Sequence, residues 1–196
     1  MWQTLWVMSD VIDADGFRAN VGIVLLHDAQ VFLGRRSGGR GWQFPQGGVR
    51  VGEQPEEAVY RELHEEIGVE RASVELVGAT PEWLRYRLPA RYIRRNQQPL
   101  CIGQKQRWFL LRLTAEEVRF DFGRTAEPEF DRWRWASWWE PVREVIYFKR
   151  PVYARALTEL GALAFPEGKP PPLPPWWDKV VSRSGRPAAA SAPTRP

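Results

Sequence analysis

Residues 47–69 read GGVRVGEQPEEAVYRELHEEIGV, and this stretch decides the fold. Its second part predicts a helix over residues 54–67. Pro55 suits the first turn, the two glutamates after it suit the positive end of the helix dipole, and Gly68 suits the end. Its first part is rich in glycine and runs directly into the helix N-terminus, where backbone N–H groups approach phosphate oxygens. The stretch therefore predicts a phosphate-binding loop followed by a helix.

The predicted helix carries three acids on one face. Glu62, Glu65 and Glu66 stand at i, i+3 and i+4, where like charges destabilise a helix by roughly 0.2–0.5 kcal/mol per pair. We expect Arg61 to pair with Glu57 one turn away, which leaves the three acids uncompensated. Carboxylates without Cys or His partners favour Mg²⁺ or Mn²⁺ over zinc. Alone, the three acids are also typical of a solvated helix face, but the neighbouring loop favours a metal site.

Strand and helix patterns are mixed along the rest of the chain. Alternating and β-branched residues predict strands, and apolar spacing predicts a last helix. The predicted strands are residues 20–27 and 30–33, joined as a hairpin, and residues 73–78, 107–113 and 130–138, and the last helix is 150–160. Because strands and helices do not alternate regularly, the chain favours an α+β fold with a mixed sheet over a doubly wound parallel sheet.

The spacing within residues 47–69 resembles the Nudix box at every defined position. These positions are Gly47, Glu53, Arg61, Glu62, Leu63, Glu65, Glu66, Gly68 and Val69. The resemblance implies an α/β/α sandwich with a catalytic loop-helix-loop. It also implies hydrolysis of a nucleoside diphosphate linked to another group. In that family, the glutamates matching Glu62, Glu65 and Glu66 hold the metal ions, Glu53 supports the loop-helix-loop, and Arg61 orients a catalytic carboxylate.

Further stretches resemble the bacterial RNA pyrophosphohydrolase branch of this family. They are residues 16–22, 42–48, 83–86, 101–106, 128–131, 133–135 and 148–150. Ala19 departs from that branch, which usually has proline there. This resemblance implies metal-dependent removal of pyrophosphate from the 5′-triphosphate end of RNA, leaving a 5′-monophosphate that promotes mRNA decay. It adds Glu129 as a further metal ligand, so that Glu66, Glu62, Arg61 and Glu129 form the expected catalytic set with two or more Mg²⁺ or Mn²⁺ ions.

Two other functions remain open. The same motif serves dinucleoside polyphosphate hydrolases, such as those that cleave diadenosine tetraphosphate. A binding module would hold capped or triphosphorylated RNA ends without cutting them. The intact acids argue against the binding module, because a pure binder gains little from a destabilising carboxylate cluster.

A basic segment supports single-stranded RNA as the substrate. Residues 85–112 hold eight Lys or Arg residues and no acid. Aromatic residues lie among them, so bases can stack while phosphates meet arginines. The expected substrate-binding residues are Arg18, Arg36, Gly47, Tyr86, Lys105, Phe148 and Lys149. The resemblance implies that Arg36 and Phe148 contact bases, while Arg18 and Lys149 hold phosphates or base edges. The alternatives are a solvent-facing Arg36, a Phe148 that only packs in the core, and a Glu129 that is an ordinary loop acid.

Composition sets the remaining expectations. The chain has 196 residues and a net charge of +4, and its single cysteine, Cys101, excludes an intrachain disulfide framework. No apolar run is long enough to span a membrane, and the N-terminus has no secretory pattern. We expect a cytoplasmic protein, and a monomer is favoured.

The chain ends differ in composition from its centre. We expect an N-terminal extension at residues 1–12, with Met1 or Met8 as the true start, and a Nudix domain at residues 13–165. Residues 166–196 hold nine of the seventeen prolines and predict a disordered tail. The PPPLPPWW segment of this tail is a candidate site for a protein partner.

Overall fold

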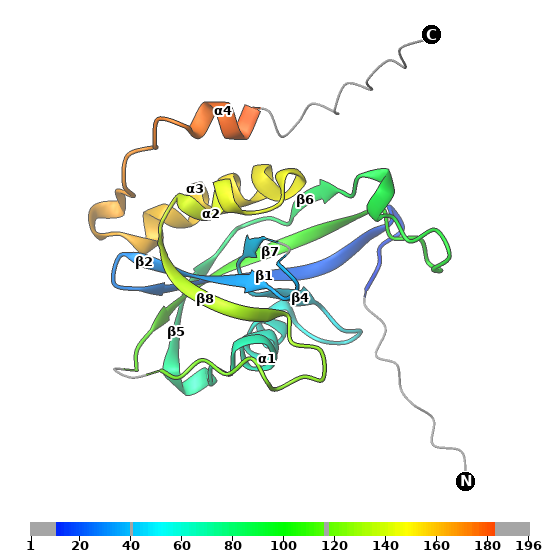
Figure 1. Ribbon diagram of the computed structural model, residues 1–196, viewed down its shortest axis with the longest axis horizontal. Helices are drawn as coiled ribbons and strands as arrows, with labels where there is room; N and C mark the ends of the chain where they lie inside the picture. The colour runs from blue at the N-terminus through cyan, green and yellow to red at the C-terminus, as the bar shows by residue number, and fades with distance from the viewer. Residues whose placement is uncertain (1–10, 40, 116–117, 183–196) are drawn as a thin grey trace.

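The computed structural model describes residues 11–39, 41–115 and 118–182 (Figure 1). Within them, eight strands form one mixed sheet with helices on both faces, which confirms the predicted α+β sandwich. The strands are β1 Phe17–His27, β2 Gln30–Arg36, β3 Trp42–Gln43, β4 Gln46–Gly48, β5 Val74–Ala79, β6 Leu84–Arg87, β7 Gly103–Leu113 and β8 Phe130–Ser137. The α-helices are α1 Pro55–Ile67, α2 Glu140–Glu144, α3 Arg150–Ala164 and α4 Trp177–Ser182. Short 3₁₀ turns are η1 Arg71–Ser73, η2 Ala90–Tyr92, η3 Tyr147–Lys149 and η4 Pro166–Gly168.

The sheet is built around β1 and β7, which run parallel through its centre. The strand order is β3-β2-β1-β7-β5, with β4 on β1, β6 on β7 and β8 on β2. Both faces of β1 are covered, so the strand is a nearly continuous apolar run rather than an alternating one. The predicted hairpin of β1 and β2 is confirmed.

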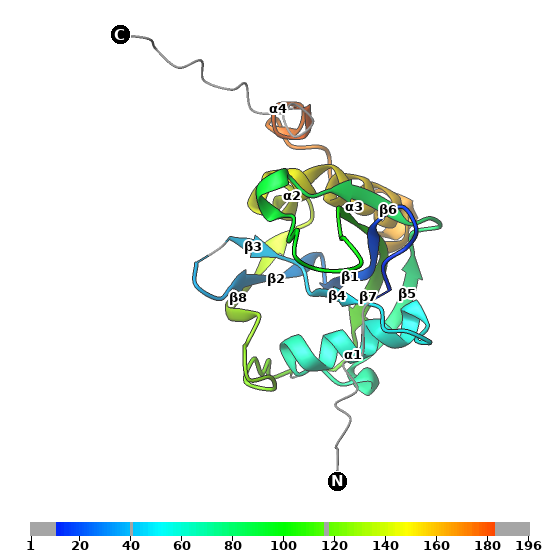
Figure 2. The same ribbon diagram turned by 90° about the vertical axis from the view of Figure 1, so that its right-hand side faces the viewer.

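One helix layer covers each face of the sheet (Figure 2). Helix α1 lies on one face and buries Val59, Leu63 and Ile67 against apolar side chains of β1 and β7. Helices α2 and α3 lie on the other face, where Tyr153 and Leu157 belong to the second core. This packing therefore fixes the position of α1 relative to β1 and β4.

Helix α1 begins and ends as predicted. The Glu57 carboxylate accepts the Gln54 N–H at 2.9 Å, which forms a capping box beside Pro55. Gly68 ends the helix in the left-handed conformation, with φ of 73°. The expected pair between Arg61 and Glu57 is wrong, because Glu57 caps the helix and Arg61 turns toward the preceding loop.

The other predicted elements are present, most of them with longer bounds. The structure extends β1 three residues toward the N-terminus, β7 four residues in the same direction, and α3 four residues past its predicted end. The added residues of β7 are polar, and they are paired with β1 and β6. Strand β5 is shifted by one residue toward the C-terminus, and β8 ends one residue earlier than predicted.

Part of the proline-rich segment lies against the domain. The Trp139 Nε1–H donates to the Pro171 carbonyl at 2.7 Å, and the rings of Trp139 and Trp177 are 4.9 Å apart. The predicted domain boundaries stay predictions, and the candidate start at Met8 lies outside the described residues. In the described part of the chain, no helix has the length and apolar character needed to cross a membrane.

Candidate active site

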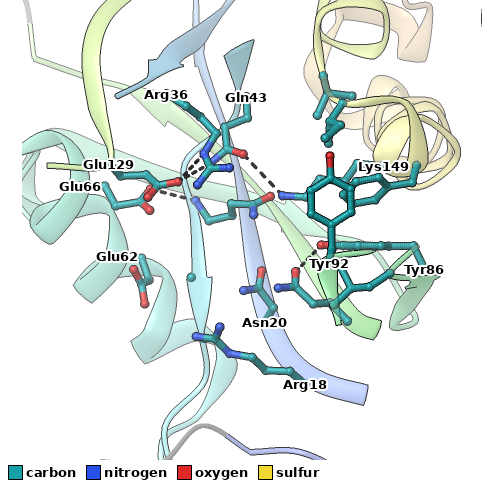
Figure 3. A pocket seen from close by; sticks show the side chains of 18 of the residues that line it. Arg18, Asn20, Arg36, Gln43, Glu62, Glu66, Tyr86, Tyr92, Glu129 and Lys149 are labelled. Carbon is teal, nitrogen blue, oxygen red and sulfur yellow. Dashed lines mark hydrogen bonds and ion pairs between the residues drawn. The ribbon is translucent and has the colours of Figure 1, made fainter. Parts of the chain in front are cut away.

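A pocket of about 500 Å³ opens between α1 and the turn η3 (Figure 3). Glu62 and Glu66 form its acidic wall, while Tyr86 and Lys149 lie on the opposite side. Asn20 on β1 also lines the pocket. The pocket also receives Arg18, Arg36, Gln46, Gly47, Tyr92, Arg94, Gln104, Glu129 and Phe148. The fold therefore brings most of the predicted site residues to one cavity.

Arg61 ties helix α1 to the loop that precedes it. Its Nε donates to Glu53 Oε1 at 2.6 Å, and its Nη2 donates to Glu53 Oε2 at 2.9 Å and to the Gly48 carbonyl at 2.7 Å. Its Nη1 donates to Glu62 and Glu65. The Arg61 hydrogen bonds lower the pKa of Glu53. One guanidinium thus holds the loop and two of the predicted metal ligands.

Glu62 and Glu66 are buried enough for their protonation to change. Burial raises the pKa of Glu62 above its ordinary value. Burial and then the neighbouring Glu62 raise the pKa of Glu66 well above its ordinary value, although Glu66 Oε2 accepts the Gln46 N–H at 3.0 Å. Both shifts favour the neutral carboxyl, and a positive charge placed nearby favours the ionised form.

The four predicted metal ligands surround a second, smaller hollow. It has about 460 Å³ and is lined by Glu62, Glu65, Glu66 and Glu129. Glu65 does not reach the main pocket. Its carboxylate accepts hydrogen bonds from Arg50 at 3.1 Å and from Arg61 at 3.2 Å.

These residues fit a hard divalent cation by their chemistry. Among the described residues, no three Asp, Glu, His or Cys side chains lie close enough to hold one ion together. Arg61 separates Glu62 from Glu65 by donating to both. The donor set is nevertheless oxygen alone, which hard divalent cations prefer. A Cβ added at Gly47 would lie 1.8 Å from the Glu62 Cδ. The Glu62 carboxylate therefore occupies the space that a side chain at position 47 would need.

Strand pairing brings Glu129 to this region from far along the sequence. Arg36 on β2 donates from Nε to Glu129 Oε1 at 2.9 Å, and Gln43 donates from Nε2 to the same oxygen at 3.0 Å. The ammonium of Lys149 is buried and lies 3.5 Å from Gln43 Oε1. Burial and then the charge of Arg36 lower the pKa of Lys149 to about 7. The guanidinium of Arg36 pairs with Glu129 and lines the pocket, which disagrees with the alternative of a solvent-facing Arg36; its predicted contact with a base stays a prediction.

Aromatic rings form the far wall. The Phe148 ring lies 5.8 Å from that of Tyr86 and 5.2 Å from that of Tyr92. The Tyr86 hydroxyl donates to Gln104. Phe148 is half-buried and lines the pocket, so it does more than pack in the core.

Lys105 lies apart from the pocket. Its ammonium pairs with Asp13 at 2.9 Å and lies 5.6 Å from the centre of the Trp83 ring. Side chains alternate along a strand, so Gln104 faces the pocket while Lys105 faces the other way.

Sequence reasoning missed the amide side chains of the pocket. Asn20 is buried and accepts from Gln106 Nε2 at 2.9 Å, and the same Nε2 lies 3.4 Å from Gln46 Oε1. Gln43 and Gln104 complete the group. The sequence indicates this group only through polar residues that interrupt apolar strands. Such residues are expected to be buried, and a buried amide needs hydrogen-bond partners.

Comparisons with known proteins decide the family. A model of the NUDIX domain matches residues 16–157. The chain belongs to the Nudix family. Nudix hydrolases generally use divalent metal ions, so the metal expected from the acids agrees with the family.

Several bacterial Nudix relatives cover most of the chain. An RNA pyrophosphohydrolase of Alkalilimnicola ehrlichii is 58% identical over 166 residues, which are 83% of this chain and 92% of that protein. An RNA pyrophosphohydrolase of Pseudoalteromonas translucida is 54% identical over 81% of this chain and 93% of its own length. That of Pseudomonas putida strain GB-1 is 58% identical over 77% of this chain and 96% of its own length.

Solved Nudix structures share the fold. The E. coli dihydroneopterin triphosphate pyrophosphohydrolase gives a TM-score of 0.56 at 17% identity, over 70% of this chain and 92% of that one. A C. elegans Ap4A hydrolase in a binary complex gives 0.51 at 16% identity, over the same shares. At these identities the likeness supports the fold alone.

Proposed function

We propose that this protein is an RNA pyrophosphohydrolase, which removes pyrophosphate from the 5′-triphosphate end of RNA and leaves a 5′-monophosphate that promotes mRNA decay. The observation that carries the proposal is the 500 Å³ pocket, which joins Glu62 and Glu66 to a wall of arginines and aromatic rings. The carboxylates can hold the cations that bind a triphosphate, and the arginines and rings can bind a nucleotide. The names of relatives that are 54–58% identical support the same substrate.

Two or more Mg²⁺ or Mn²⁺ ions are the proposed cofactors. Glu62, Glu65, Glu66 and Glu129 are the proposed ligands, since they surround one hollow beside the pocket. When bound, such ions neutralise phosphate charge and lower the pKa of a water molecule.

The chain's own residues position the reactants. Glu66 or Glu129 orients the attacking water or accepts its proton, because each carboxylate lines the pocket. Arg61 holds Glu62 and Glu65 in place and so acts as a positioning residue. Water then attacks the anhydride, and pyrophosphate leaves, or two orthophosphates leave in turn. Little covalent chemistry falls to the protein, so positioning and electrostatics carry the rate.

The remaining pocket residues hold the RNA end. Arg18 and Lys149 hold phosphates or base edges, while Arg36 and Phe148 contact the bases nearest the 5′ end. Tyr86 supports Phe148, and the Gly47 loop approaches a phosphate. RNA as the substrate would place the protein in the cytoplasm, where it acts as a monomer, and the proline-rich segment would serve a protein partner.

End-group analysis of a 5′-triphosphorylated oligoribonucleotide tests the proposal. With Mg²⁺ we expect a 5′-monophosphorylated product, and with a chelator we expect none. Diadenosine tetraphosphate is assayed in parallel at the same enzyme concentration. A higher kcat/KM for the dinucleotide would replace the proposal with a dinucleoside polyphosphate hydrolase, and tight RNA binding without product would replace it with a binding module.

A further inference from the structure

A row of aromatic rings leads from the pocket to the surface. Tyr86 lies inside and is 6% exposed, whereas Tyr92 and Tyr147 are 41% and 38% exposed. Phe148 joins them, because its ring lies 5.2 Å from that of Tyr92 and 5.4 Å from that of Tyr147. Figure 3 shows Tyr86 and Tyr92 together on the side opposite Glu62 and Glu66. The wall of the pocket therefore continues outward as exposed rings.

Arg91 lies between the two exposed rings. Its Cζ is 5.0 Å from the centre of the Tyr92 ring and 5.9 Å from that of Tyr147. No ion pair with Arg91 occurs among the residues that the structure describes. We call Arg91, Tyr92 and Tyr147 the outer ledge. It combines an uncompensated cation with two ring faces, the pairing by which proteins bind single-stranded nucleic acid.

The surroundings of the outer ledge favour an anionic occupant that carries rings. Arg87, Arg94 and Arg95 are exposed in the same segment, and residues 85–112 contain no acid. The turn η2 carries Arg91 and Tyr92, while η3 carries Tyr147 next to the pocket residues Phe148 and Lys149. An RNA that extends beyond the nucleotides held in the pocket would pass over these side chains.

We propose that the outer ledge binds the nucleotides of single-stranded RNA that follow those held in the pocket, with a base stacked on Tyr147 and a phosphate against Arg91. This inference rests on the proposed function and extends it to substrate length. Because Arg91 and Tyr147 lie beyond the residues that line the pocket, the ledge adds contacts for further nucleotides, and the enzyme prefers RNA longer than a dinucleotide. A free nucleotide or a short dinucleoside polyphosphate gains nothing from it.

The test compares kcat/KM for a 5′-triphosphorylated dinucleotide and a 5′-triphosphorylated hexanucleotide in the full-length protein with Mg²⁺. The hexanucleotide should be the better substrate of the unchanged protein. Tyr147→Ala should lower this length advantage about tenfold through KM, since one stacked base is lost. Tyr147→Phe should retain it, because the ring remains. Arg91→Ala should lower it more than Arg95→Ala, which removes a charge of the same loop that contacts no ring.

The possible negative results of this test lead to different conclusions. If neither RNA is hydrolysed, the proposed function falls and the inference falls with it. If both are hydrolysed with equal kcat/KM, or if Tyr147→Ala keeps the full length advantage, the inference alone is overturned. If Arg91→Ala and Arg95→Ala lose the same part of the length advantage, general charge attraction explains the effect, and the inference is also overturned. Thermal melts of each variant exclude unfolding as the cause.

Discussion

Gly47 shows how one missing side chain shapes the site. A methyl group at this position would overlap the Glu62 carboxylate, at 1.8 Å from its Cδ. In Gly47→Ala the carboxylate therefore has to move by about one ångström. We expect kcat to fall about 100-fold, the scale of such a displacement, with the fold retained. Gly123→Ala is the matched control, because its new methyl group would meet only Asp121 Oδ1 at 3.4 Å. Equal kcat in the two variants would contradict this account of the loop.

Glu66 is the carboxylate whose charge matters most directly. Glu66→Gln keeps the volume and an oxygen that accepts the Gln46 N–H, so the melting temperature should change little. Turnover should fall by about 10²–10⁴, the usual contribution of a positioned acid or base. Steady-state kinetics on triphosphorylated RNA measure the effect. Near-normal turnover would remove Glu66 from its assigned role.

The site could be predicted from sequence only where it is local. The spacing of Glu62, Glu65 and Glu66 on one helix indicated a common face. Because side chains alternate along β7, Gln104 faces the pocket and Lys105 does not. In the sequence the two residues belong to one basic and polar run, which does not distinguish them. The contact of Glu129 with Arg36 depends on the pairing of β2 with β8 across more than ninety residues, and spacing cannot reveal it.

At the scale of elements, Arg61 joins α1 to the loop before it. Its bonds to Glu53, Glu62 and the Gly48 carbonyl are largely buried. Arg61→Ala leaves buried carboxylates without their cation, so the free energy of unfolding should fall by about 3 kcal/mol. Urea denaturation measures it. Arg71→Ala, which removes only a contact over the Tyr60 ring, is the control and should cost less. A loss in Arg61→Ala no larger than in the control would contradict the tie.

The proline-rich segment has a testable effect on stability. Trp177 packs on Trp139, whose indole N–H is bonded to Pro171. An aromatic pair contributes about 1 kcal/mol beyond its buried area, so Trp177→Ala should lower the melting temperature by roughly 2–4 °C. Leu173→Ala, at a residue that is 56% exposed, should leave it unchanged. Equal melting temperatures would show that this packing does not stabilise the domain in solution.

Element types were easier to predict from sequence than element ends. Helix α1 has a proline at its start and a glycine at its end, and its bounds were correct to one residue. The first four residues of β7 were not predicted, because most of them are polar and resemble a loop, and only their pairing with β1 and β6 makes them a strand. In the proline-rich segment, Trp176, Trp177, Val180 and Val181 pack against the core, as their apolar character would indicate.

In the whole molecule, carboxylates and aromatic rings lie on opposite sides of one cavity. Helix α1 brings Glu62 and Glu66 to one side, close to Glu129 and its partner Arg36, and η2 and η3 bring Tyr92, Phe148 and Lys149 to the other. The fold produces this separation because β1 and β7 carry both sides at fixed positions. Divalent cations on the acidic side would let a triphosphate lie between the two.

Calorimetric titration of Mg²⁺ or Mn²⁺ into the protein, with a 5′-monophosphorylated oligoribonucleotide present, tests the central claim most directly. The account predicts metal uptake by the unchanged protein and its loss or strong weakening in Glu62→Gln and Glu66→Gln. Uptake that is absent from the unchanged protein, or undiminished in both variants, would contradict it.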